Sequence, residues 1–146
     1  MSLKFYLIPM KKHCILLGFV LLVYGTSLAQ DMSQNVLRCR GSRVTNLANG
    51  DDFGFAVDVR LVKQQRIEWI QQNGQRIHTY TITSVNGTWT DLSQPGSVTY
   101  AIVYQDKPGQ VHIERDAAGV YIVCDLRGGS EGSYYKLFID NVSLDQ

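Results

Sequence analysis

The chain has 146 residues, of which 45% are hydrophobic and 18% charged, and its formal net charge is +1. This is the length of one domain, which excludes a multidomain enzyme and a membrane protein with several spans. The apolar content and the low net charge argue against disorder. The pI of about 7.7 gives no reason to expect nucleic acid as a partner, because nucleic-acid-binding domains are usually strongly basic.

Residues 1–29 have the features of a secretory signal peptide. Lys11 and Lys12 form a positive n-region, and the stretch 14–24 that follows is apolar. This stretch is too short to span a bilayer, which takes about 20 helical residues; a single-pass anchor is the alternative interpretation. We therefore expect a secreted or periplasmic protein with no stable membrane span after signal cleavage.

The end of the signal is marked by Ser27-Leu28-Ala29, a small-x-small pattern that signal peptidase recognises, so we expect cleavage after Ala29. Met1 and Met10 are both candidate start residues. Residues 30–146 are predicted to form a single β domain. These residues include eleven basic and thirteen acidic ones, so their net charge is −2.

Alternating apolar and polar residues run through the remaining chain, and no segment shows a sustained helical period. Turn signals separate the alternating segments, which predicts an all-β fold: an antiparallel meander of eight to nine short strands, built as a closed barrel or a two-sheet sandwich. The predicted strands are 36–44, 53–61, 66–72, 75–82, 88–92, 98–104, 111–115, 120–126 and 133–139.

The best-defined hairpin is predicted around Asn73-Gly74. Asn-Gly is favoured in two-residue type I′ turns because both positions need a positive φ. This turn would place Trp69 opposite His78 and Ile67 opposite Tyr80, whereas a slip by one residue would send Trp69 to the other face. A second Asn-Gly, Asn86-Gly87, predicts the turn into strand 88–92.

Cys39 and Cys124 remain after signal removal, and in an exported protein they predict one disulfide. In a meander this bond would link the first strand to the second-last and so close the sheet. Two free, buried thiols are the alternative. Neither cysteine has a second Cys or a His at ligand spacing, so we predict no metal site and no cofactor.

The common catalytic patterns, such as Gly-x-Ser-x-Gly, His-Glu-x-x-His and Cys-x-x-Cys, do not occur in the sequence. We therefore assign no catalytic residues and expect a non-enzymatic protein. An Asp/Glu-dependent hydrolase or lyase is a weaker alternative, which would need two carboxylates about 5–10 Å apart. The carboxylates considered for it lie on different predicted strands: Asp58, Glu68, Glu114 and Asp125.

Aromatic residues with a polar tip are the most suggestive feature, because such rings suit ligand pockets and interfaces. The candidate binding face consists of Trp69, His78, Tyr80, Tyr100 and Tyr104. We expect a binding or interaction module, whose partner is a protein, a glycan or a small apolar ligand.

Gly87-Thr88-Trp89 resembles the Gly-x-Trp element that opens lipocalin-type barrels, although here it follows at least three strands. The resemblance implies a barrel that holds a small apolar ligand.

Two further patterns concern the surface. Arg38, Arg40 and Arg43 cluster around Cys39, which indicates a charged edge strand or a small anion site. Asn86 and Asn141 each open an Asn-x-Ser/Thr pattern for N-glycosylation.

Overall fold

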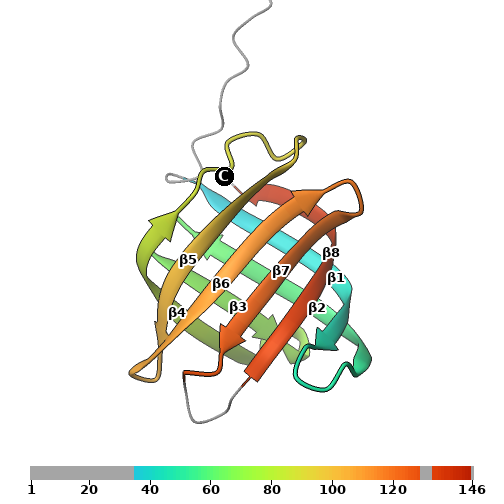
Figure 1. Ribbon diagram of the computed structural model, residues 1–146, viewed down its shortest axis with the longest axis vertical. Helices are drawn as coiled ribbons and strands as arrows, with labels where there is room; N and C mark the ends of the chain where they lie inside the picture. Colours follow the sequence, from blue (N-terminus) through green and yellow to red (C-terminus); the bar gives the residue numbers. More distant parts are fainter. Residues whose placement is uncertain (1–34, 129–132, 146) are drawn as a thin grey trace, which may run out of the picture.

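The computed structural model describes residues 35–128 and 133–145, so the predicted signal peptide lies outside the described residues. Eight antiparallel strands follow one another around a closed barrel (Figure 1). The strands are β1 (Val36–Asn46), β2 (Asp52–Val62), β3 (Arg66–Gln71), β4 (Arg76–Asn86), β5 (Gly96–Tyr104), β6 (Lys107–Asp116), β7 (Gly119–Leu126) and β8 (Ser133–Asp145). The predicted all-β meander is confirmed, and the structure selects the barrel over the sandwich.

The barrel closes because β1 pairs with β8 as well as with β2. Cys39, for example, lies between Val59 of β2 and Val142 of β8. β1 is therefore not an edge strand, and the interpretation of its arginines as edge protection is wrong: closure removes the free edges of the sheet. Among the described residues, no helix is long and apolar enough to cross a membrane.

The two ends of the barrel differ. The strands alternate in direction, so the β1–β2, β3–β4, β5–β6 and β7–β8 connections share one end, here called the open end. Segment 87–95, between β4 and β5, lies at the other end, at the top of Figure 1. We call this the Trp89 end, because the Trp89 side chain is buried there with 3% exposure.

The predicted strand 88–92 is wrong, and Trp89 explains the difference. The segment crosses the barrel end, where the Trp89 indole Nε1 donates a hydrogen bond to the carbonyl oxygen of Gln94 at 3.1 Å. Gly96 gives the indole room, since a Cβ at this position would lie 2.5 Å from Trp89 Cδ1. The Asp91 carboxylate accepts hydrogen bonds from the backbone N–H and the hydroxyl of Ser93, which hold the turn.

The hairpin of β3 and β4 has the predicted register. Trp69 pairs with His78, and Ile67 pairs with Tyr80. Asn73 and Gly74 have φ angles of 55° and 92°, as the type I′ turn requires. The preceding residue, Gln72, also has a positive φ of 51°, so the backbone of Gln72–Gly74 is left-handed, and the Gln75 N–H donates to the Gln72 carbonyl oxygen at 3.2 Å.

The predicted Cys39–Cys124 disulfide is wrong, because both cysteines are free, buried thiols. β8 lies between their strands, and their partners on β8 are Val142 and Tyr135. These two partners lie roughly 23 Å apart along the strand at about 3.3 Å per residue, and each cysteine is within about 5.5 Å of its own partner. A disulfide needs Cα atoms about 4.4–6.8 Å apart, so this closed barrel keeps the thiols apart.

Candidate functional site

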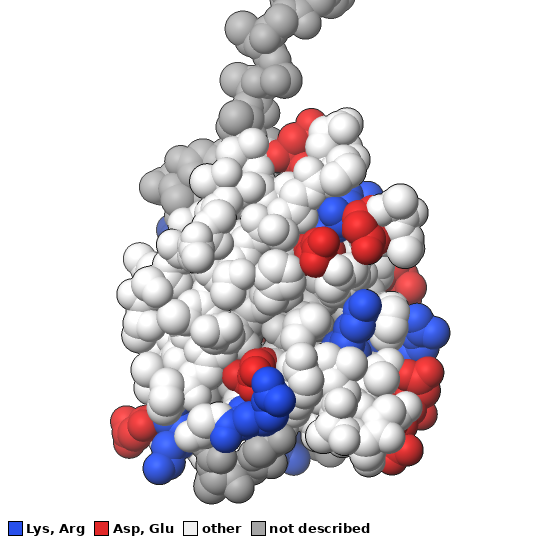
Figure 2. Space-filling view, viewed as in Figure 1, with Lys and Arg blue, Asp and Glu red and all other residues white. Residues whose placement is uncertain are grey.

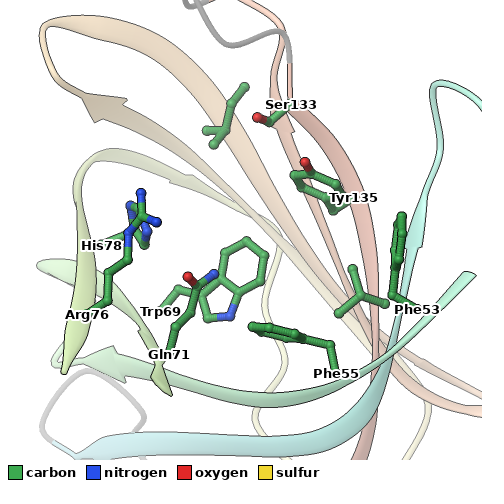
Figure 3. Close-up of a pocket in the computed structure, with 10 residues that line it drawn as sticks. Phe53, Phe55, Trp69, Gln71, Arg76, His78, Ser133 and Tyr135 are labelled. Carbon is green, nitrogen blue, oxygen red and sulfur yellow. The ribbon is translucent and has the colours of Figure 1, made fainter. Parts of the chain in front are cut away.

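A cavity of about 350 Å³ lies at the open end of the barrel (Figure 3). Six of its lining residues are apolar or aromatic: Val44, Phe53, Phe55, Trp69, Leu126 and Tyr135. Four are polar or basic: Gln71, Arg76, His78 and Ser133. The cavity arises because the buried core does not extend to the open end of the barrel, whereas the Trp89 side chain fills the opposite end.

The alternation of β2 extends from the core into the cavity wall. Val57, Val59 and Leu61 are buried, but Phe53 and Phe55, in the same phase, are 47% and 38% exposed. The two phenylalanines therefore belong to the inner face of the strand, at a level where the barrel is no longer filled.

Trp69 lies in the middle of the cavity wall in Figure 3. Its ring centroid is 6.1 Å from that of Tyr135 on β8, in an edge-to-face arrangement with an interplanar angle of 72°. His78 lies on the other side, with a centroid distance of 6.5 Å. The indole Nε1 of Trp69 is buried without a hydrogen-bond partner among the described residues, so ring packing holds this side chain.

His78 is connected to β5 by a hydrogen bond. Its Nδ1 lies 2.6 Å from the hydroxyl oxygen of Tyr104, which also accepts a hydrogen bond from Gln105 Nε2 at 3.3 Å. The Tyr104 ring contacts that of Tyr80, at a centroid distance of 4.9 Å. A layer of rings from β4 and β5 thus supports the polar wall of the cavity.

The five residues of the predicted binding face all lie on the inner side of β3, β4 and β5, at different depths. Trp69 and His78 line the cavity, and Tyr104 lies directly behind His78. Tyr80 and Tyr100 are buried in the core, Tyr100 with 0% exposure. Burial also raises the pKa of the Tyr100 hydroxyl, which is buried without a partner in the described structure.

Several cavity residues were not predicted from the sequence. Arg76 is in phase with His78 on β4, and Tyr135 is paired with the inward-facing Cys124. Phe53 and Phe55 belong to the clearest alternating segment of the chain. Strand phase could have placed all four on the inner face, but their height along the barrel depends on how all eight strands are staggered.

The four carboxylates considered for hydrolytic chemistry alternate with buried residues, and they lie on the outer face of the barrel. Asp58 accepts two hydrogen bonds from Arg38, at 3.0 and 2.6 Å, and Glu68 accepts one from Arg66 at 2.7 Å. Asp125 is bound by Arg127, whose hydrogen bonds lower the pKa of this carboxyl.

Glu114 belongs to a hydrogen-bonded group on the same outer face. It accepts hydrogen bonds from Tyr121 and from His112 Nε2, and these lower its pKa. The same contact raises the pKa of Tyr121 to about 12. His112 Nδ1 lies 2.8 Å from the Thr99 hydroxyl oxygen. The side chains of this group therefore make their hydrogen bonds with one another. None of the four carboxylates lines the cavity.

A second hollow, of about 800 Å³, lies on the outer face beside β1, β2 and the β3–β4 turn. It contains the Arg38–Asp58 ion pair together with Arg40 and Arg60. Figure 2 shows the opposite side of the molecule, where charged side chains lie along the right-hand side of the view and near the two ends, whereas much of the surface over β4 to β6 carries none. Within residues 35–128 and 133–145, no group of His, Cys, Asp or Glu is arranged to hold a metal ion.

No protein-family model, no curated protein and no solved structure matches the chain.

Proposed function

We propose that this protein is an exported, non-enzymatic binding protein whose open barrel end holds a small, largely apolar molecule. The cavity carries the proposal: its volume of about 350 Å³ falls within the range of roughly 300–1,000 Å³ typical of small-molecule sites. Like those sites, it combines an apolar, aromatic wall with a few polar groups.

The burial of the aromatic residues favours a small ligand over a protein or glycan partner. A macromolecule that used the predicted binding face would need the rings of that face on the outer surface, but Tyr80 and Tyr100 are buried and Trp69 is only 7% exposed. A ligand small enough to enter the open end would meet Trp69 and Tyr135 directly.

The export part of the proposal rests on the sequence of residues 1–29. The non-enzymatic part is supported by the pairing of Asp58, Glu68, Glu114 and Asp125 with neighbours on the outer face.

Binding of N-phenyl-1-naphthylamine, a neutral aromatic probe that fluoresces in apolar sites, tests the proposal. We expect saturable binding that Ser133→Trp abolishes, because Ser133 lines the cavity and is only partly buried. The matched control is Ser143→Trp, which places the same ring on the outer face of β8, beside Arg38. Absence of saturable binding, or equal effects of the two substitutions, would refute the proposal.

A further inference from the structure

The walls of the cavity differ in chemistry, and the difference points to a class of ligand. In Figure 3, Arg76 and His78 lie together on the β4 side, and Phe53 and Phe55 lie on the opposite, β2 side. Trp69 lies between the two groups. A molecule in the cavity would therefore have cationic and hydrogen-bonding groups on one flank and aromatic rings on the other.

Arg76 differs from the ion-paired arginines of the outer face. Arg38 is bound to Asp58 on the neighbouring strand β2, whereas Arg66 and Arg127 are each bound to a carboxylate two residues away in the chain. In the described parts of the chain, no ion pair involves Arg76, which lines the cavity at the rim. Its guanidinium therefore retains its donors for a bound molecule.

The rest of the lining favours an anion at this position. The described lining residues contain no Asp or Glu, so no carboxylate there competes for the guanidinium. Arg76 is exposed in the free protein, but the apolar body of a bound molecule would displace water from beside it, and a charge-assisted hydrogen bond is stronger in such a place than in bulk water. Ser133 adds a hydroxyl across the cavity in Figure 3.

We infer that the cavity selects molecules with a flat apolar body and one anionic group, a carboxylate or a sulfonate. Arg76 binds the anion, and Phe53, Phe55 and Trp69 bind the body. The inference rests on the proposed function of the same cavity and adds the charge of the ligand to it.

Two fluorescent probes that differ by one anionic group test this assignment. 8-Anilino-1-naphthalenesulfonate is N-phenyl-1-naphthylamine with a sulfonate added. We expect Arg76→Gln to weaken sulfonate binding about tenfold or more, as loss of a charge-assisted hydrogen bond does, and to change binding of the neutral probe less than twofold. Added salt should weaken sulfonate binding to the wild type but not to Arg76→Gln.

Arg40→Gln is the matched control, because it removes the same charge from the outer hollow. We expect it to leave the affinity for both probes unchanged. If Arg76→Gln affects the two probes equally, or if Arg40→Gln is the variant that loses sulfonate binding, the assignment to Arg76 is wrong while the cavity still binds the neutral probe. If neither probe binds saturably, the proposed function fails together with the inference.

Discussion

The Nδ1 atom of His78, in the polar wall of the cavity, lies 2.6 Å from the hydroxyl oxygen of Tyr104 on the neighbouring strand β5. Gln105 Nε2 donates to the same oxygen, so the tyrosine hydroxyl can give its own proton to an unprotonated Nδ1. A neutral imidazole that accepts at Nδ1 and carries its proton on Nε2 fits this arrangement, and we expect that tautomer.

This arrangement predicts the tautomer of neutral His78 and the effect of Tyr104→Phe. Long-range nitrogen–proton NMR spectra should show Nδ1 as the unprotonated nitrogen. Tyr104→Phe keeps the ring contact with Tyr80 but removes the hydroxyl, so we expect the free energy of unfolding to fall by about 1 kcal/mol. A protonated Nδ1 in the neutral form would contradict the assignment of donor and acceptor.

The two tryptophans should respond differently to replacement by phenylalanine. Trp89 Nε1 donates to Gln94, whereas Trp69 Nε1 is buried without a partner in the described structure. Trp89→Phe breaks a hydrogen bond, and Trp69→Phe removes an unsatisfied donor whose burial is itself unfavourable. Urea denaturation should show Trp89→Phe to be the more destabilising by at least about 1 kcal/mol. Equal losses of stability in the two variants would mean that the hydrogen bond of Trp89 Nε1 contributes no more than the unpaired Nε1 of Trp69.

Closure of the barrel should depend on Gly41. The pairing of β1 shifts at this residue on both sides, and a Cβ there would lie 1.9 Å from the carbonyl oxygen of Phe138 on β8. We expect Gly41→Ala to lower the free energy of unfolding by about 3 kcal/mol or more, because backbone of the closing strand has to move.

Gly54→Ala is the control for Gly41→Ala, since a Cβ at Gly54 meets nothing within 4 Å. It should leave stability unchanged or raise it by up to about 1 kcal/mol, because alanine reduces the entropy of the unfolded chain. Thermal or urea unfolding measures both variants. Equal destabilisation would show that the β1–β8 contact at Gly41 is not tight.

The buried thiols predict a loss of stability in alkaline solution. Burial raises the pKa of Cys39 and of Cys124 from 9.0 to about 12. Above pH 9 the unfolded chain therefore loses thiol protons that the folded barrel keeps. The stabilisation from each thiol is complete below about pH 9 and is lost as the pH rises toward 12, with a slope of up to about 1.4 kcal/mol per pH unit.

Cys124→Val isolates the contribution of one thiol. The decline of its unfolding free energy between pH 9 and 11 should be shallower than that of the wild type by about 1 kcal/mol per pH unit. Alkylation followed by peptide mapping gives an independent check: both barrel thiols should react slowly in the native protein and rapidly in urea. A disulfide-linked peptide pair in the native protein would contradict the free thiols.

Local features of the sequence determined most of the strands. Alternation placed the segment 53–61 correctly, because successive side chains of a strand point to opposite faces and only one face of this sheet is buried. Asn73-Gly74 set the register of β3 and β4, because the φ angles of the turn align the strands beside it. Both signals extend over a few residues and need no knowledge of the rest of the chain.

The tertiary structure alone decided what these strands enclose. Whether an inward side chain fills the core, as Tyr100 does, or lines the cavity, as Trp69 does, depends on its height along the barrel axis. That height follows from the stagger of all eight strands and from the closure of β1 on β8, which no local pattern encodes. The same non-local geometry separates Cys39 from Cys124. It also places residues 88–92, which were predicted as a strand, in the segment 87–95 that closes one end.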